Sequence, residues 1–332
     1  MYRFPQLESE SRLSRIAVLT SGGDAPGMNA AIRALVRAGN EEGIEVFGSY
    51  RGFTGLVEAD IWPLNSAAVA NILHRGGTCL KSDRCPEFHQ PAVRMNAAAT
   101  LRSMAIQALV VIGGDGSLTG AHLLQQETGF PVIGIPGTID NDITGTEDTI
   151  GFDTAVNTAL DAIDRIRDTA NSHDRLFLVE VMGRNSGFLA THAGLAGGAE
   201  LILVPDSPID FQTLCDSLNQ SRLKGRMSSI IVIAEGESGR TQRLASKLEE
   251  QGYEPRVCIL GHTQRGGAPS GHDRLLASCL GAMAISYLQA GISNVMLAVQ
   301  RNEITTVALE TILEPRPFKD QRLLELARKL RG

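Results

Sequence analysis

Short apolar runs alternate with segments of helical periodicity along nearly the whole chain. The run RIAVLT at 15–20 precedes a glycine-rich turn and then MNAAIRALVRAG at 28–39, whose apolar residues have helical spacing. Apolar runs of this length are typical of strands covered on both faces, as in a parallel sheet. The alternation therefore predicts βαβ units in mainly parallel, doubly wound α/β sheets. Other strands are expected at 44–50, 108–113, 131–137, 175–183, 200–205, 228–236, 256–261 and 294–302, the last as the closing strand, and other helices at 120–127, 154–170 and 273–291.

The expected strands are too many for one compact sheet. We therefore expect two Rossmann-like lobes, with a boundary near residue 150. In such sheets ligands bind in the crevice outside the carboxyl ends of the strands. The active site is expected there, in the cleft between the two lobes.

Composition narrows the class of protein. The chain has 332 residues, enough for two domains, and its 35 glycines exceed the average share of about 7%. The net charge is −6 and there is no basic block, so nucleic acid and anionic membranes are not expected as partners. An anionic ligand would therefore have to be held by local arginines.

Cysteine usage and hydropathy predict a cytoplasmic protein. The five cysteines are odd in number and lack CxxC spacing, which favours free thiols in a reducing compartment over disulfides or a zinc site. The N-terminal stretch MYRFPQLESESRLS has no apolar signal-peptide core. No stretch reaches the roughly 18 apolar residues that span a bilayer.

Three glycine-rich stretches follow expected strands: TSGGDAPGMN at 20–29, GGDGS at 113–117 and PGTID at 136–140. Each could be an ordinary turn, since Gly, Pro, Asn and Asp are the usual turn residues. Three of them in succession at buried strand ends favour phosphate binding, because glycine lets a phosphate approach the backbone and a following helix offers free N–H groups. In GGDGS, a loop in our interpretation, Asp115 suits Mg²⁺ and Ser117 can donate to a phosphate oxygen.

Charged residues of the opposite sign follow later strands. Arg184 follows one in VEVMGRNSG, and His262 and Arg265 follow another in ILGHTQRGG. Glu235 ends a third strand, where it could accept hydrogen bonds from sugar hydroxyls. A lone arginine is more often a solvated charge, but two flanked by glycines beyond apolar strands predict phosphate contacts, which guanidinium groups make bidentately.

Read together, TSGGDAPGMNAAIR, IGGDGS, PGTIDNDI, VEVMGR and LGHTQRGG resemble the bacterial ATP-dependent 6-phosphofructokinases, in order from Arg15 to about residue 320. The resemblance implies ATP-dependent phosphorylation of fructose 6-phosphate at the 1-hydroxyl, the committed step of glycolysis. It implies an ATP-binding lobe and a sugar-phosphate lobe. The N-terminal extension, expected to be flexible, departs from the family and has no assigned role. The expected bounds of the two lobes and the extension are 15–150 plus 263–313, 151–262 plus 314–332, and 1–14, respectively.

The same resemblance assigns roles at the active site. Asp140 would accept the proton of the sugar hydroxyl, with Thr138, Asp142 and Arg184 as further catalytic residues. Because an alcohol is too weak an acid to be ionised beforehand by a carboxylate, the proton would move late in the transfer. Mg²⁺ would be bound by Asp115. The implied ATP-binding residues are Gly23, Arg84, Cys85, Gly114, Asp115, Gly116 and Ser117.

A second implied set binds the sugar phosphate. In the family, Arg175 and Arg256 reach the 6-phosphate from a neighbouring subunit of a homotetramer, so one chain alone would have an incomplete site. The implied substrate residues are Thr138, Asp140, Arg175, Met182, Gly183, Arg184, Glu235, Arg256, His262 and Arg265.

The effector site implied by the resemblance lies between subunits and binds ADP or phosphoenolpyruvate. Two departures predict a weakened or altered site: Ser66 replaces an effector-binding arginine, and Met227–Ser228 replaces a Lys–His pair. One lost charge-assisted contact weakens binding about ten- to a hundredfold. The matching residues are Arg33, Arg37, Arg167, Gly198, Glu200, Lys224 and Arg226.

Other functions explain the sequence less well. Pyrophosphate-dependent relatives have Asp and Lys where this chain has Gly116 and Gly137, and an aspartate there would repel the α-phosphate of a nucleotide. An NAD-dependent oxidoreductase would explain the alternation, but the first glycine-rich stretch lacks the dinucleotide-binding spacing. A catalytically silent regulatory subunit would be expected to lack Asp115 or Asp140, and both are present.

Overall fold

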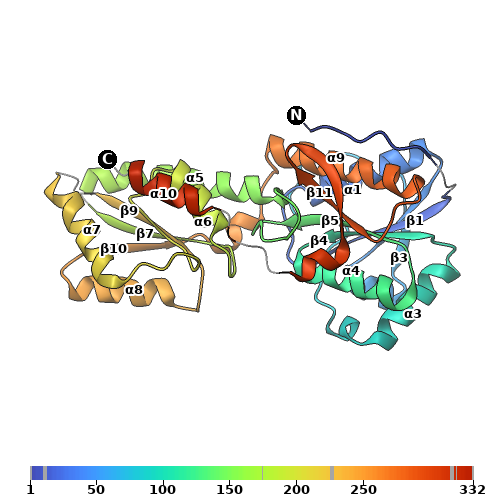
Figure 1. The fold of residues 1–332 in the computed structure, drawn as a ribbon, viewed down its shortest axis with the longest axis horizontal. Coiled ribbons are helices and arrows are strands. Elements are labelled where there is room, and N and C mark those ends of the chain that lie inside the picture. The colour runs from blue at the N-terminus through green and yellow to red at the C-terminus, as the bar shows by residue number, and fades with distance from the viewer. Residues whose placement is uncertain are drawn as a thin grey trace. The chain divides into compact units, whose positions relative to one another are not determined.

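The chain forms two compact units (Figure 1). The computed structural model describes residues 2–9, 13–173, 175–224, 228–314, 318 and 320–330. The first unit comprises Met1–Thr138, Asp142–Asp153 and Arg265–Arg316, and the second comprises Ile139–Asn141, Thr154–Gln264 and Pro317–Gly332.

The first unit is built on an eight-stranded sheet with the order β12-β11-β5-β4-β1-β2-β3, in which β6 also pairs with β5. The pairings are parallel except for the two outer pairs, β2 with β3 and β11 with β12. Interior strands carry the continuous apolar runs because both faces are covered. The strands are β1 (Arg15–Ser21), β2 (Glu45–Ser49), β3 (Ile61–Leu64), β4 (Ala108–Gly113), β5 (Val132–Thr138), β6 (Ile150–Gly151), β11 (Val295–Gln300) and β12 (Glu303–Ala308).

Helices cover both faces of this sheet, with α1 and α9 on one face and α3 and α4 on the other (Figure 1). Helices α1 and α9 approach so closely at Gly281 that a Cβ atom added there would lie 2.4 Å from the carbonyl oxygen of Ala31. This contact requires glycine. The helices are α1 (Met28–Glu41), α2 (Phe53–Glu58), α3 (Pro91–Ser103), α4 (Asp115–Thr128) and α9 (Gly271–Gln289), with 3-10 turns η1 (Pro86–His89) and η3 (Leu309–Leu313).

The second unit has a four-stranded, fully parallel sheet with the order β10-β7-β9-β8. Its core forms where β7, β8 and β9 pack against α7 and α8, with α6 and α10 on the other face (Figure 1). The elements are α5 (Phe152–His173), β7 (Leu176–Val181), α6 (Phe188–Ala196), β8 (Leu201–Leu203), α7 (Phe211–Leu223), β9 (Ser229–Ala234), α8 (Arg240–Glu250), β10 (Pro255–Ile259), η2 (Gly261–Arg265) and α10 (Gln321–Leu330).

The last expected strand is not the closing one. A hairpin follows β11, and β12 pairs with it in antiparallel fashion. The two turn residues, Arg301 and Asn302, both have positive φ, 52° and 61°, as a two-residue hairpin turn requires. The usual Asn-Gly signal is absent here, which is why the pattern of the sequence did not indicate the turn. None of the described helices is both long and apolar enough to cross a membrane.

Candidate functional site

The glycine-rich segments of the first unit meet at one edge of its sheet. Strand β1 pairs in parallel with β4, and β4 with β5, so the segments that follow them lie side by side. The Ser117 hydroxyl lies among these segments: a Cβ atom added at Gly22 would be only 3.1 Å from its Oγ. A Cβ atom at Gly114 would be 3.7 Å from the Cβ of Thr138. The ends of the three strands therefore surround one small region.

The segment GGDGS is not a loop, because helix α4 already begins at Asp115, with Gly114 as its N-cap. The first-turn N–H groups of α4 thus point to the same edge of the sheet, with Asp115 exposed among them. A Cβ atom at Gly116 would meet nothing within 4 Å, and its φ is not positive. Neither packing nor backbone conformation requires glycine there, and the space around it is open.

Arg265 lies against the first glycine-rich segment. A Cβ atom at Gly23 would be 2.3 Å from Nη1 of Arg265, which donates a hydrogen bond to the Asp24 carbonyl oxygen at 3.2 Å. A side chain at position 23 would displace the guanidinium group. Gly23 thus has a packing role beside any role in ligand binding.

The stretch that carries Arg84 and Cys85 is tied to the same segment, because the Ser82 hydroxyl donates to the carbonyl oxygen of Gly22. The Arg84 side chain is exposed and Cys85 is half-buried at the start of η1. Burial raises the pKa of the Cys85 thiol, so the group is not an activated thiolate.

The segment after β5 contains the two carboxylates of PGTIDNDI. Asp140 is 2% exposed, and its carbonyl oxygen accepts a hydrogen bond from the Ser186 hydroxyl at 3.0 Å. Asn141 has a φ of 49°, a left-handed conformation that is uncommon outside glycine, and Asp142 is half-buried. Thr138, at the end of β5, is held through its carbonyl oxygen, which accepts from the Thr149 hydroxyl at 2.7 Å.

In the second unit, the strand register brings the residues after β7 beside Glu235. Val181 of β7 pairs with Ala234 of β9, and the N–H of Arg184 donates to Oε1 of Glu235 at 2.6 Å. Arg184 has a φ of 52°, and the preceding Gly183 has a φ of 145°. The exposed Arg184 side chain is therefore presented by a strained turn fixed by Glu235.

A residue missed in the sequence, Gln264, holds Met182. The Gln264 side chain is fully buried, its Oε1 accepts from the N–H of Met182 at 2.8 Å, and its Nε2 donates to the Ala155 carbonyl oxygen at 3.4 Å. It lies inside ILGHTQRGG, between His262, which is exposed, and Arg265. The only sequence signal for this role was that Gln264 is an uncharged polar residue inside the motif ILGHTQRGG.

Arg175 and Arg256 lie elsewhere on the second unit. Arg256 pairs with Phe177 near the start of β7, and Arg175 immediately precedes that strand. Both arginines are therefore at the amino ends of the parallel strands, whereas Arg184 follows the carboxyl end of β7. The structure does not bring Arg175 and Arg256 together with Arg184 within the chain.

The effector candidates form a cluster in the second unit and a pair in the first. Arg167 donates to the carbonyl oxygens of Gly197 and Gly198 at 2.6 and 2.8 Å and lies 3.6 Å from Oε1 of Glu200. The other Glu200 oxygen accepts the N–H of Ile230 at 2.5 Å. Arg33 and Arg37 lie on α1, and the hydroxyl of Ser66 accepts a hydrogen bond from Asn40 at 3.1 Å. Lys224 is exposed directly after α7. Arg226 and Met227 lie outside the described residues.

Among the described residues, no group of three or more His, Cys, Asp or Glu side chains is placed to bind a metal ion. Asp115 is an exposed carboxylate at a helix start. This arrangement fits Mg²⁺, which is usually bound by one or two carboxylates together with phosphate oxygens and water.

Glycine-rich strand ends around the start of a helix are the arrangement with which α/β proteins bind phosphate groups at the carboxyl edge of a parallel sheet. The family described as "Phosphofructokinase" matches residues 15–288. This chain belongs to the phosphofructokinase family.

Two relatives match this chain almost end to end. "ATP-dependent 6-phosphofructokinase 1" of Thermus thermophilus is 51% identical over 320 residues, covering 96% of this chain and 99% of that protein. "ATP-dependent 6-phosphofructokinase" of Thermotoga neapolitana is 50% identical over 319 residues, covering 96% and 100%. Among solved structures, phosphofructokinase from Saccharomyces cerevisiae is 35% identical with a TM-score of 0.84. The match includes 96% of this chain but only 48% of the longer yeast chain.

Proposed function

We propose that the chain transfers a phosphoryl group from ATP to the 1-hydroxyl of D-fructose 6-phosphate, forming fructose 1,6-bisphosphate and ADP. The observation that carries this proposal is the 51% identity, over 96% of the chain, to a protein named for that activity. The first unit would bind ATP, within residues 15–150 plus 263–313, and the second the sugar phosphate, within 151–262 plus 314–332. The enzyme would act in glycolysis in the cytoplasm.

The start of α4 would receive the phosphates of ATP. Its free N–H groups and positive dipole end favour anions, Ser117 adds a hydroxyl donor, and the open space at Gly116 leaves room for a phosphate. Asp115 would hold Mg²⁺, which when bound neutralises charge on the transferring phosphate. Gly23, Arg84, Cys85 and Gly114 would complete the nucleotide site.

Asp140 would act as the base. It orients the sugar hydroxyl and accepts its proton as the bond to phosphorus forms, a contribution of about 10²–10⁴ in rate. Arg184 would stabilise the charge that develops on the transferring phosphoryl group, and Thr138 and Asp142 would support the same step. The strained turn fixed by Glu235 supports this role, since strain persists where the surroundings enforce a functional geometry.

The sugar phosphate would be held from two subunits of a homotetramer. Arg175 and Arg256 would reach the 6-phosphate of a neighbouring subunit, and their position at the amino ends of the second sheet supports this separation. Residues of the same subunit would bind the rest of the sugar phosphate: Thr138, Asp140, Met182, Gly183, Arg184, Glu235, His262 and Arg265.

ATP is favoured over pyrophosphate as the donor. Gly116 faces open space, where an aspartate would bring a negative charge towards a nucleotide phosphate. A Cβ atom at Gly137 would already lie 3.2 Å from the side chains of Ile112 and Met28, so lysine could enter only if these side chains shifted. A regulatory subunit without activity is disfavoured because Asp115 and Asp140 are both present.

The effector site for ADP or phosphoenolpyruvate would be present but weakened or altered in preference. Arg33, Arg37, Arg167, Gly198, Glu200, Lys224 and Arg226 would form it. Ser66 bonds to Asn40 and cannot replace an arginine that reaches an anion. Sugar-phosphate saturation curves with and without each effector test this proposal; shifts as strong as in relatives with the full set would contradict it.

The decisive assay offers fructose 6-phosphate and Mg²⁺ with ATP or pyrophosphate and measures fructose 1,6-bisphosphate. We expect turnover with ATP only, and a loss of about 10²–10⁴ in kcat for Asp140→Asn, with unchanged thermal unfolding as the folding control. Turnover with pyrophosphate would overturn the donor assignment and leave the sugar site standing. No turnover with either donor would favour the silent regulatory subunit.

A further inference from the structure

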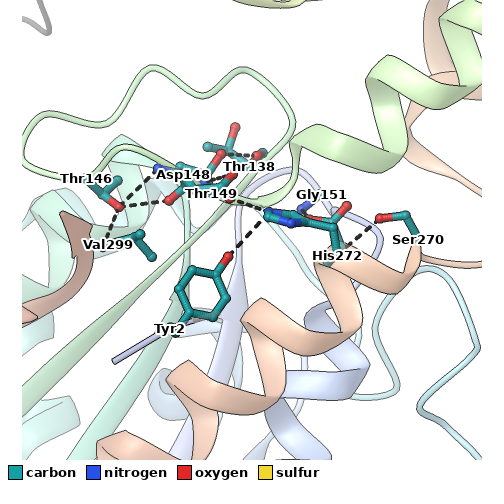
Figure 2. Close-up of polar contacts among 10 residues, drawn as sticks. Tyr2, Thr138, Thr146, Asp148, Thr149, Gly151, Ser270, His272 and Val299 are labelled. Carbon is teal, nitrogen blue, oxygen red and sulfur yellow. Dashed lines mark hydrogen bonds and ion pairs between the residues drawn. The ribbon is translucent and has the colours of Figure 1, made fainter. Parts of the chain in front are cut away.

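A polar cluster outside the proposed reaction joins the N-terminal segment to the end of β5 (Figure 2). It comprises Tyr2, the neighbouring residues Asp148 and Thr149 between β5 and β6, and His272 in the first turn of α9. All four residues belong to the first unit. The N-terminal segment had no role in the sequence interpretation, yet Tyr2 lies in this cluster.

The ion pair between Asp148 and His272 is the centre of the cluster. Oδ2 of Asp148 is hydrogen-bonded to Nε2 of His272, and Oδ1 accepts the N–H of Thr149 at 3.0 Å. The side chains of Asp148 and His272 are 20% and 43% exposed, so water screens the pair in part. Asp148 thereby connects α9 to the backbone of the segment before β6.

The charge of His272 depends on its surroundings. The hydrogen bond to Asp148 raises the pKa of His272 to about 8, the charges of Asp148, Asp153 and Asp273 act in the same direction, and burial opposes them. His272 is thus largely protonated at neutral pH. Above pH 8 the cation is lost, and the three carboxylates that face it remain.

Tyr2 covers the pair from the N-terminal segment. Its hydroxyl lies 3.4 Å from Nε2 of His272, and the two rings are tilted with centroids 6.3 Å apart. The next residue fixes this placement: the N–H of Arg3 donates to the Asn302 carbonyl oxygen at 2.8 Å, and the Arg3 carbonyl accepts from Ile304 at 3.0 Å. Burial, with the charge of Asp148, raises the pKa of Tyr2, so its hydroxyl stays protonated.

The cluster reaches the candidate active site through Thr149. Its hydroxyl donates to the carbonyl oxygen of Thr138 at 2.7 Å, and Thr138 pairs with Gly151 where β5 meets β6. The N–H of Gly151 donates to Oδ1 of the buried Asp273 at 2.8 Å, next to His272 on α9. Two adjacent residues of α9 therefore fasten the segment that holds the end of β5, one residue before Ile139 and two before Asp140.

We propose that Asp148 and His272 are positioning residues for phosphoryl transfer: their ion pair, covered by Tyr2, holds Thr149 and the strand end at Thr138 in the geometry that the base requires. The proposal rests on the proposed function. Because small misplacements of reacting groups cost up to 10²-fold in rate, we expect loss of the pair to lower kcat about tenfold. The KM for ATP should change less, since the N–H groups of α4 are not in the cluster.

The kinetic test compares His272→Gln, Asp148→Asn and His272→Arg with the unaltered protein at pH 7 and pH 9. Glutamine and asparagine should lower kcat at pH 7, whereas arginine, which keeps a cation at both pH values, should restore most of it. The unaltered protein should lose turnover between pH 7 and 9, and His272→Gln should not. His192→Gln is the matched control, because it removes a His–Asp pair with Asp320, at 3.0 Å, from the second unit.

Amide hydrogen exchange over residues 137–151 at pH 7 provides a readout independent of activity. Exchange should be faster in His272→Gln and Asp148→Asn and unchanged in His192→Gln. If the unaltered protein does not turn over ATP and fructose 6-phosphate, the proposed function fails, and exchange alone decides the positioning role. A lower Tm with unchanged kcat and exchange would show a purely structural pair and overturn the proposal, as would a loss of kcat without faster exchange.

Discussion

Two arginines adopt the same strained conformation for different reasons. Arg184 and Arg301 each have a φ of 52°, and each donates its backbone N–H to a glutamate carboxylate, Glu235 at 2.6 Å and Glu147 at 2.8 Å. A left-handed conformation costs a non-glycine residue about 1–2 kcal/mol. Arg301 forms a hairpin turn, whereas the guanidinium group of Arg184 is assigned to the transferring phosphoryl group.

Glycine at either position should separate strain from function. Arg184→Gly and Arg301→Gly both relieve strain, so neither should destabilise the fold by more than about 1 kcal/mol. Only Arg184→Gly should lower kcat, by about 10²–10³, because it removes a donor to the transition state. Thermal unfolding and steady-state kinetics on both variants provide the check. A similar loss of kcat in Arg301→Gly would show that the loss comes from the altered backbone and not from the missing guanidinium group of Arg184.

For single residues, the sequence could predict which residues belong to the candidate site, but not which side chains and backbone groups they contact. Glycine-rich strand ends and flanked arginines are local signals, so Asp115, Arg184 and Arg265 could be predicted as candidates. Gln264 and the Asp148–His272 pair depend on contacts 82 and 124 positions apart in the chain, which no local pattern encodes.

A buried arginine connects the helices α3 and α4 through an ion pair with an exposed glutamate. The Arg94 side chain is 4% exposed, donates to Oε2 of Glu127 at 2.7 Å through Nε, and donates to the Phe88 carbonyl oxygen at 2.6 Å. One guanidinium group thus joins η1, α3 and α4. The hydrogen bond from Arg94 lowers the pKa of Glu127.

Arg94→Ala should destabilise the protein by about 1–3 kcal/mol, because it leaves the Phe88 carbonyl without this buried donor, whereas the exposed Glu127 can be solvated by water. Since the pKa of Glu127 is lowered by folding, its stabilisation is present above its unfolded pKa and is lost as the pH falls through the folded pKa. The variant should therefore lose less stability on acidification than the unaltered protein. Urea unfolding at pH 7 and pH 4 measures both effects. Arg15→Ala, which breaks an exposed pair with Glu45, should cost less than about 1 kcal/mol.

The interior strands could be predicted from sequence, because a strand buried on both faces has a continuous apolar run. The outer strands β3 and β12 could not. Pro63 lies within β3, which only an edge strand tolerates, and β12 carries the polar stretch EITTV beside a turn without glycine. Edge strands are exposed on one side, so their composition is close to that of loops.

At the scale of the whole molecule, the proposal predicts that one chain cannot form a complete sugar-phosphate site. Asp140 and Arg184 belong to the same unit of one chain, whereas Arg256 lies at the opposite ends of the strands in that unit and would serve a neighbour. Asp140→Asn and Arg256→Ala should each be nearly inactive at low fructose 6-phosphate. Mixed oligomers of the two variants, made by co-expression with two affinity tags, should recover activity.

The expected recovery follows from counting sites. An intact site needs Asp140 from an Arg256→Ala chain and Arg256 from an Asp140→Asn neighbour, which random mixing provides in about a quarter of the sites of a symmetric oligomer. Mixed oligomers of Asp140→Asn and Arg184→Ala are the control. Both residues act within one chain, so every site lacks one of them and no activity should return. Activity of the first mixture equal to the mean of its parents would place Arg256 in the site of its own chain and remove the argument for a shared site.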